Sequence, residues 1–321
     1  MNYKKSLELM QKAKKIGIFT HANVDGDALG SAFALYYYLT DLGKDVDVIA
    51  DTTIPNQLKF LNLESLIKQK SNKFYDLVIA TDCNTVDMMG INKLSFMSNT
   101  NTIQFDHHPL NPDFAGVNNV DTATSSASEI VASFFLENNI KVSDRIAELL
   151  ITGIITDSGG FKFSCTTTST MGVVYKILNQ TNIKISDLMS SIFETETLDS
   201  FEMQKYAINH TEFLFDNKAC IIKIDNSFFS TTGIDPNACK FLTRIGTEIG
   251  GVNLVALISE VQPNVNKVSF RSRNGYSASN CAKVFGGGGH LVASGCKIFG
   301  SFDDAVTRII KAMGDELKCR E

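Results

Sequence analysis

The fold is decided near the start of the chain, where residues 16–50 read IGIFTHANVDGDALGSAFALYYYLTDLGKDVDVIA. The apolar run at residues 16–20 predicts a short strand, and residues 46–50 predict a second one. Between them, residues 28–42 predict a helix that Gly43 ends. Neither strand alternates cleanly between apolar and polar residues, which is typical of a parallel sheet covered on both faces. The stretch therefore predicts a strand–helix–strand unit of an α/β fold.

The same alternation of strands and helices continues along the first half of the chain. Two more apolar runs, at residues 77–81 and 102–105, predict further strands of the sheet. Helices are predicted at residues 126–138, 143–155, 170–178 and 185–192, and a polar linker helix is predicted at residues 195–210. We therefore expect an N-terminal doubly wound, mainly parallel sheet over residues 1–190.

The pattern changes after the predicted linker, which we place at residues 191–211. Strands that form hairpins are predicted at residues 213–215, 219–224, 254–260 and 267–271, and a helix is predicted at residues 278–285. Four consecutive glycines, residues 286–289, follow that helix. We expect residues 212–321 to form a second, smaller α/β domain.

Composition narrows the functional class. The chain has 321 residues, of which 44% are hydrophobic and 20% charged, and its net charge is −5. A net negative charge argues against the broad basic surface that binding of long duplex nucleic acid or an anionic membrane would require. The chain contains no apolar run of signal-peptide or membrane-span length. Its seven cysteines show no C-x-x-C spacing, which is typical of reduced thiols, so we expect a cytoplasmic protein.

Acidic residues and histidines gather where the predicted apolar segments end. In chain order they are His21, Asp25 and Asp27 after the first strand, Asp82 after the strand at 77–81, Asp106, His107 and His108 after the strand at 102–105, and Asp157 after the apolar stretch at 149–156. Ligands of open parallel sheets bind at the carboxyl ends of the strands. We therefore expect these residues to converge at one edge of the sheet.

Four carboxylates brought that close would repel one another unless cations neutralise them. Each of these motifs, taken alone, has a structural interpretation. An isolated D-x-D is more often a turn or a helix cap, and a lone histidine is more often structural. Together, mixed carboxylate and imidazole ligands suit a transition ion such as Mn²⁺ better than Mg²⁺ alone. There are enough ligands for two divalent ions that share one carboxylate, spaced about 3.5–4 Å apart.

Five segments resemble, in order, the motifs of one enzyme family. HANVDGDALGSA, ATDCN, FDHHPLNPDF and ITDSGGF resemble the four motifs of the DHH phosphoesterase superfamily, and GGGGHLVASG resembles the glycine-rich signature of its accessory domain, DHHA1. Within the superfamily the chain resembles the small two-domain branch of nanoRNases and pAp phosphatases, which also includes cyclic-di-AMP and linear dinucleotide phosphodiesterases.

The resemblance implies a role for each residue at the sheet edge. It assigns His21, Asp25 and Asp82 to a first metal, and Asp27, Asp82, His107 and Asp157 to a second, with Asp82 bridging the two. It places His108 against the substrate phosphate and Asp106 behind the site as a support. Two divalent ions, most simply Mn²⁺, would make hydroxide available near neutral pH for attack on phosphorus.

The expected reaction is hydrolysis of short nucleotides to mononucleotides. The substrates implied are nanoRNA, linear dinucleotides such as pApA, and the 3′-phosphate of pAp, with cyclic-di-AMP as the alternative. An inorganic pyrophosphatase of the DHH type is disfavoured because its lysine-rich C-terminal motif is missing, and a RecJ-like processive exonuclease because the chain is short and acidic. A nucleotide sensor with a degenerate site is disfavoured because no ligand is missing.

The second domain is expected to hold the substrate over the metal site. Arg271 and Arg273 stand at i and i+2, so on a strand they would share one face and form a phosphate clamp; the simpler reading is a solvated basic edge. Gly287, Gly288 and Gly289, followed by His290, would let the backbone approach a ligand closely; the simpler reading is a flexible loop. The expected partner is a short nucleotide, and a homodimer is left open.

Overall fold

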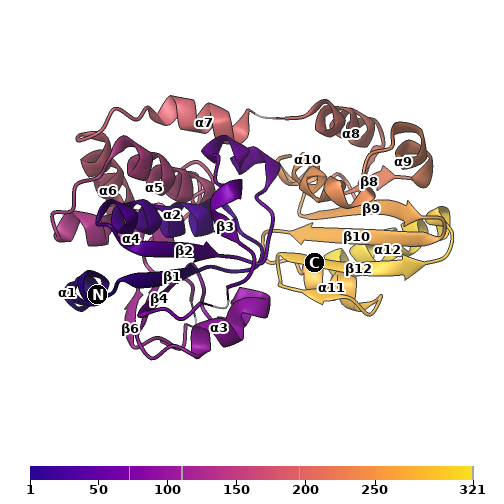
Figure 1. Cartoon of the computed structure of the whole chain (residues 1–321). Coiled ribbons are helices and arrows are strands. Elements are labelled where there is room, and N and C mark those ends of the chain that lie inside the picture. Colours follow the sequence, from indigo (N-terminus) through magenta and orange to yellow (C-terminus); the bar gives the residue numbers. More distant parts are fainter. Residues whose placement is uncertain (72, 110, 195, 320–321) are drawn as a thin grey trace. The chain divides into compact units, whose positions relative to one another are not determined.

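The computed structural model describes residues 1–71, 73–109, 111–194 and 196–319, and the chain divides into two compact units, residues 1–195 and 196–321 (Figure 1). Within the described residues each unit contains one six-stranded sheet. The second unit includes the helix α8 (Leu198–Asn209), which the sequence predicts as a linker; Thr195, its predicted start, lies outside the described residues. The predicted domain limits of 190 and 211 stay predictions.

The first sheet is parallel throughout, as predicted. Its strands are β1 (Lys15–Phe19), β2 (Asp45–Ile49), β3 (Ile67–Lys68), β4 (Leu77–Thr81), β5 (Thr102–Asp106) and β6 (Val117–Val120), in the order β3-β2-β1-β4-β5-β6. The pattern did not predict β3 and β6, because β3 has only two residues and β6 contains two asparagines. The α/β class predicted from the sequence is confirmed.

Helices cover both faces of this sheet, which explains why its strands do not alternate. The helices are α1 (Tyr3–Lys12), α2 (Gly26–Asp41), α3 (Lys93–Met97), α4 (Ala127–Glu137), α5 (Asp144–Asp157), α6 (Thr168–Leu178) and α7 (Ile185–Phe193), with 3-10 turns η1 (Asn56–Leu61), η2 (Glu64–Leu66) and η3 (Val86–Asn92). Ile16 and Ile18 of β1 pack in the core formed with α2, α4 and α5. The next residue, Phe19, packs on the opposite face against Phe96 of α3.

The strand order places a ligand-binding position between β1 and β4. These two strands are adjacent, and the connections run outward from them in opposite directions to β2 and β3 and to β5 and β6. A crevice opens at the carboxyl ends of parallel strands where the order reverses in this way. The chain leaves β1 through His21 and leaves β4 through Asp82, so the topology brings these residues to the same edge.

The second sheet is mixed. Its strands are β7 (Thr211–Leu214), β8 (Ala219–Ile224), β9 (Leu254–Gln262), β10 (Val265–Ser272), β11 (Gly288–Gly289) and β12 (Ala293–Phe299), in the order β11-β12-β10-β9-β8-β7. The pair β8–β9 is parallel and the other pairs are antiparallel. Besides α8, the helical segments are α9 (Asn226–Thr232), η4 (Pro236–Leu242), α10 (Thr243–Thr247), α11 (Ala278–Lys283) and α12 (Phe302–Lys318). The four predicted strands are present, whereas β11 and β12 were not predicted.

Two cores lie on the two faces of this sheet. Phe270 of β10 packs with α11 and α12, whereas Leu257 of β9 packs with α8, α9 and η4 on the opposite face. Lys267, Ser269 and Arg271 alternate with the buried residues of β10, so they lie on the same face as Leu257. No helix in the described part of the chain is long and apolar enough to cross a membrane.

Candidate metal centre and substrate site

The residues predicted at the sheet edge meet there, although one of them comes from a different kind of element. His21 follows β1, Asp82 follows β4, and His107 and His108 follow β5. Asp157 was counted with the strand ends, but it is the last residue of helix α5. The apolar run that precedes it is buried on all sides within that 14-residue helix, so the run lacks the polar face of a surface helix.

The ligand atoms form one group of His21, Asp25 and Asp82 and a second of Asp27, His107 and Asp157, and Asp82 also groups with His107 and His108. In the first group, His21 Nε2 lies 3.2 Å from Asp82 Oδ2 and 3.9 Å from Asp25 Oδ1. In the second group, His107 Nε2 lies 3.3 Å from Asp157 Oδ2 and 3.9 Å from Asp27 Oδ2. His107 Nε2 is also 3.6 Å from the other Asp82 oxygen, Oδ1. The resemblance assigns the first group to one metal and the second group, with Asp82 added, to the other; Asp82 lies next to the second group through His107.

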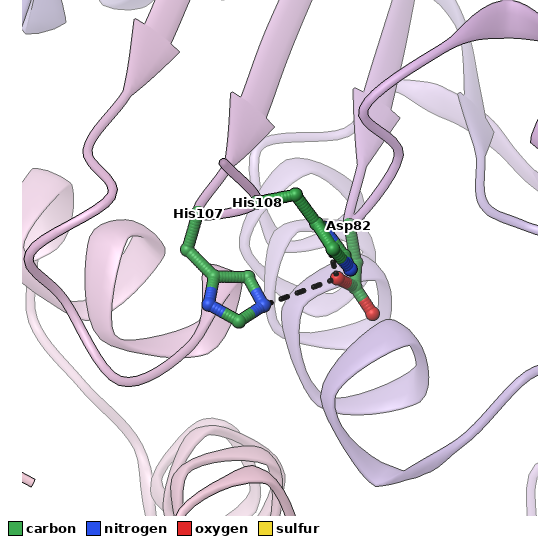
Figure 2. Close-up of side chains that lie close together, drawn as sticks. All are labelled: Asp82, His107 and His108. Carbon is green, nitrogen blue, oxygen red and sulfur yellow. Dashed lines mark ion pairs between the residues drawn. The ribbon is translucent and has the colours of Figure 1, made fainter. Parts of the chain in front are cut away.

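Asp82 has the features of a residue held for a ligand. Its φ of 55° lies in the left-handed region, which is uncommon for a residue other than glycine. Its backbone N–H donates to the Phe105 carbonyl at 2.9 Å, which fixes this turn against the neighbouring strand. Within the described chain, Oδ1 is buried and has no hydrogen-bond donor. Figure 2 shows this carboxylate close to His107 and His108, and a nitrogen of each ring lies 3.6 Å from Oδ1, a setting that suits a cation.

Three groups of the cluster, His21, Asp27 and Asp157, have raised pKa values and so hold protons that a metal ion would displace. Burial lowers the pKa of His21, but hydrogen bonds with Asp25 and Asp82 outweigh this and raise it to about 10. Burial and the neighbouring carboxylates of Asp82 and Asp157 raise the pKa of Asp27 well above its ordinary value. Burial also raises the pKa of Asp157, to about 6. A metal ion would displace these protons, because the ligands bind metal in their deprotonated forms.

His108 is held by a separate set of contacts. Its Nδ1 lies 2.8 Å from Asp106 Oδ1, closer than its 3.6 Å separation from Asp82 Oδ1. Asp106 is fully buried, and its other oxygen accepts from the His108 backbone N–H and from the Asn111 amide. The hydrogen bond with Asp106 raises the pKa of His108. Asp106 therefore orients the ring and favours its protonated form.

Two contacts around the metal centre were missed at the level of sequence. Asn111, inside the segment FDHHPLN, donates to Asp106, and the spacing of an asparagine after the histidine pair could have suggested it. The backbone amides of Ala127 and Ser128 donate to the two oxygens of Asp27. No residue type signals a backbone donor that lies 100 residues away along the chain.

A cavity of about 490 Å³ lies in the second unit on the face of β10 and β12 that carries Arg271. Lys267, Arg271 and Lys297 line it, together with small residues that include Ser269 and Gly295. No carboxylate is among the described residues of its lining. Three cations without a compensating acid make the cavity suitable for a phosphate group.

The glycine run forms a tight hairpin at the edge of this cavity, and the structural need for glycine differs from one position to the next. A Cβ on Gly287 would lie 2.3 Å from the Gly295 carbonyl, and Gly289 has a φ of +143°, so both positions need glycine for the turn. A Cβ on Gly288 would meet nothing within 4 Å, yet Gly288 lines the cavity. His290 is exposed, and its backbone closes the hairpin with Ala293.

Arg273 is not brought into the cavity with Arg271. Its guanidinium donates to the carbonyls of Val252, Thr247 and Ile249, which follow or end α10. The strand β10 ends at Ser272, so the i, i+2 rule for a shared face no longer applies to Arg273. The structure therefore brings one of the two predicted clamp arginines to the cavity and uses the other to hold a loop.

Comparisons with known proteins agree with this architecture. Residues 15–154 match the model of the DHH family, N-terminal domain, and residues 218–318 match that of the DHHA1 domain. The chain is 29% identical over 306 residues to the bifunctional oligoribonuclease and PAP phosphatase NrnA of Thermus thermophilus, covering 94% of this chain and 90% of that protein. It is 27% identical to the protein of the same name from Bacillus subtilis, covering 94% and 93%.

A solved structure gives the same fold. The exopolyphosphatase-related protein from Bacteroides fragilis superposes with a TM-score of 0.85 at 22% identity, covering 99% of this chain and 97% of that one. Both domain models match in the expected order, and the relatives align over nearly the whole chain. This chain belongs to the DHH/DHHA1 phosphoesterase family.

Proposed function

We propose that this phosphoesterase hydrolyses short nucleotides, namely nanoRNA and linear dinucleotides such as pApA, and removes the 3′-phosphate of pAp. The observation that supports this most directly is the pair of ligand groups at the switch point of the sheet, between which Asp82 faces His21 with one oxygen and His107 with the other. Two cations that share a bridging carboxylate can activate a water molecule for attack on phosphorus. A hydrolase with such a site therefore does not require a protein nucleophile.

The residues of the site fit two divalent ions. His21, Asp25 and Asp82 would hold one, and Asp27, Asp82, His107 and Asp157 would hold the other. The buried Asp82 Oδ1, which has no donor in the described chain, is an acceptor that a cation would satisfy. Mixed imidazole and carboxylate ligands favour Mn²⁺. When bound, such ions supply a deprotonated water and neutralise charge on the phosphate.

The protein itself supplies a hydrogen-bond donor, His108, and a residue that orients it, Asp106. Asp106 accepts from His108 Nδ1, which leaves Nε2 to donate to a non-bridging phosphate oxygen of the substrate. The hydrogen bond with Asp106 raises the pKa of His108, which favours the positively charged ring where negative charge would develop in the reaction. Asp106 acts through His108 and does not need to contact the substrate.

The choice of a short nucleotide substrate rests on two observations. The relatives from Thermus thermophilus and Bacillus subtilis are named as oligoribonucleases and PAP phosphatases. The second unit offers a cavity lined by Lys267, Arg271 and Lys297, which suits a second phosphate or a terminal phosphate. With a net charge of −5 and a single confined cation group at this cavity, a short anion is a better match than a long polyanion.

A competition assay tests the proposal. The protein with Mn²⁺ receives pApA, pAp and cyclic-di-AMP together, and the products are separated by chromatography, with EDTA in a parallel reaction. We expect pApA and pAp to be consumed before cyclic-di-AMP and EDTA to stop all turnover. Asp82→Ala should abolish turnover while the circular dichroism spectrum stays unchanged, and Asp113→Asn, an exposed change in the loop after β5, should retain activity.

Two outcomes would contradict the proposal. Preferential cleavage of cyclic-di-AMP would move the protein to the cyclic dinucleotide branch of the family. Turnover by Asp82→Ala close to that of the unmodified protein would remove the bridging carboxylate from the reaction.

A further inference from the structure

The two carboxylates that follow β1 are held in different ways. Asp25 is the N-cap of α2, and one of its oxygens, Oδ1, accepts both the Asp27 and the Ala28 amides at 3.0 Å. The side chain of Asp25 is 57% exposed, whereas that of Asp27 is 1% exposed. Asp25 is therefore held through one oxygen at an exposed position, whereas both oxygens of the buried Asp27 depend on its surroundings.

Those surroundings are the first turn of α4. Asp27 Oδ2 accepts the Ala127 amide at 2.6 Å, and Oδ1 accepts the Ser128 amide at 2.7 Å. With one amide on each oxygen, the carboxylate cannot rotate without breaking a hydrogen bond. The direction in which Asp27 presents its remaining lone pairs therefore follows the direction of two backbone N–H groups.

Glu129 holds this turn from within the same helix. Its Oε2 accepts from the Ser125 amide at 2.9 Å, from the Ser125 hydroxyl at 2.7 Å and from the Thr170 hydroxyl of α6 at 2.9 Å. Glu129, Ser125 and Thr170 are all fully buried. Ser126 caps the helix through the Glu129 amide at 3.1 Å. Residues 125 to 129 thus form a closed set of contacts around the two amides that Asp27 uses.

Close packing transmits any shift of this turn to Asp27. A Cβ on Gly153 of α5 would lie 2.0 Å from Ser128 Oγ and 3.0 Å from Asp27 Oδ1. The turn is therefore packed against α5 on one side and Asp27 on the other, with no room for a compensating movement.

We propose that Glu129 is a positioning residue for the metal centre: by holding the first turn of α4 it orients Asp27 toward the ion that Asp27, His107 and Asp157 would share. Glu129 Oε1 is buried without a donor in the described chain, but Glu129 is in none of the described groups whose ligand atoms lie close enough together to hold an ion, so we assign it no ligand role. The inference rests on the two-metal centre of the proposed function. It predicts that Glu129 affects one metal position and not the other.

The test is a titration of the metal-free full-length protein with Mn²⁺, in which free Mn²⁺ is followed by electron paramagnetic resonance. Glu129→Gln keeps the size of the side chain, but an amide oxygen accepts two hydrogen bonds where this carboxylate oxygen accepts three. We expect one of the two binding steps to weaken by about 10–100-fold, as changes to supports of metal ligands do. Thr170→Val removes one of the three donors and should have a smaller effect in the same direction.

Two controls separate positioning from stability. Glu137→Gln changes an exposed glutamate at the other end of α4 and should leave both steps unchanged. Ile130→Val makes a small cavity in the buried side of α4, so it should lower the thermal midpoint of the metal-free protein without weakening Mn²⁺ binding.

Background variants identify the position affected. In Asp25→Asn, which impairs the first group, Glu129→Gln should still weaken the remaining step. In Asp157→Asn, which impairs the second group, Glu129→Gln should have no further effect. Weakening in the Asp157→Asn background, or none in the unmodified protein, would overturn the positioning role. Absence of Mn²⁺ binding by the unmodified protein would instead overturn the proposed function.

Discussion

At the scale of single residues, the pair His108 and Asp106 links the site to pH. Asp106 is fully buried and hydrogen-bonds His108 Nδ1, and this contact raises the pKa of the ring. Protonated His108 is the stronger donor to phosphate, because a charged hydrogen bond is about twice as strong as a neutral one. The alkaline side of the pH profile should therefore report on this pair.

Asp106→Asn should move the alkaline limb of kcat to lower pH. Removing the negative charge lowers the pKa of His108, so the ring loses its proton at a lower pH. At pH values above the pKa, a decrease of one unit in the pKa of His108 lowers the fraction of protonated rings to about a tenth of its previous value. The measurement is kcat against pH at saturating Mn²⁺, with Asp113→Asn in the same loop as the control. An unchanged alkaline limb in Asp106→Asn would show that His108 does not act in its charged form.

Adjacent glycines of the hairpin at residues 286–289 should behave differently. Gly288→Ala adds a methyl group that meets no protein atom within 4 Å, so the thermal midpoint should stay unchanged, while KM for pApA rises by about tenfold if a substrate approaches there. Gly287→Ala forces a methyl group to 2.3 Å from a carbonyl oxygen and should cost about 1–3 kcal/mol of stability. A Gly288→Ala protein with unchanged KM would mean that substrate does not approach this side of the hairpin.

At the scale of elements, α2, α4 and α5 meet through small residues next to the metal centre. A Cβ on Gly30 of α2 would lie 2.4 Å from the Leu149 carbonyl, and one on Gly153 of α5 would lie 2.0 Å from Ser128 Oγ. Glycine at these two positions lets the helices approach closely enough for the α4 amides to reach Asp27. The same contacts therefore define both the packing and the position of a metal ligand.

Gly153→Ala should both destabilise the fold and weaken Mn²⁺ binding. Overpacking of this kind costs about 1–3 kcal/mol, and the methyl group would also press on Asp27. Urea unfolding and Mn²⁺ titration measure the two effects. The matched control is Gly172→Ala in α6, where a methyl group meets nothing within 4 Å and should stabilise the helix by about 0.5–1 kcal/mol. Normal Mn²⁺ binding by Gly153→Ala would separate the packing of α5 from the site.

At the scale of the whole molecule, protons and metal compete for the same cluster. In the metal-free fold the pKa of Asp157 is about 6 against an ordinary 3.8, and that of His21 is about 10 against 6.5. Both are raised, so protonation stabilises the folded state. The Asp157 contribution is complete below 3.8 and lost as pH rises through 6, and the His21 contribution is complete below 6.5 and lost as pH rises through 10.

The stabilisation by Mn²⁺ should therefore increase with pH. Metal-free protein should lose thermal stability as pH rises from about 5 to 8, whereas Mn²⁺ replaces the lost protons and binds more tightly as the ligands deprotonate. At a concentration 100 times its dissociation constant, an ion adds about 2.7 kcal/mol. The measurement is the thermal midpoint over the same pH range with EDTA or Mn²⁺. Asp82→Ala should abolish the difference, and a difference independent of pH would contradict the argument.

The sequence by itself determined the parallel sheet and the residues that would gather at its edge. Strand and helix periods are local properties, and the carboxyl ends of parallel strands share an edge whatever the loops do. His21, Asp82 and His107 can therefore be placed together from the pattern of strands alone. The resemblance to DHH motifs supplied their division into two ligand groups, which spacing alone could not supply.

Only the tertiary structure decided the contacts that hold those residues. The α4 amides reach Asp27 from 100 residues away, and a backbone donor has no signature in the sequence. Although the sequence predicts a helix at residues 143–155, only the structure shows that this helix, α5, continues to Asp157 and brings it to the ends of the strands. Arg273, one residue beyond the end of β10, donates to the carbonyls of Val252 and Ile249 in the loop after α10. Strand ends depend on pairing across the sheet, not on local composition.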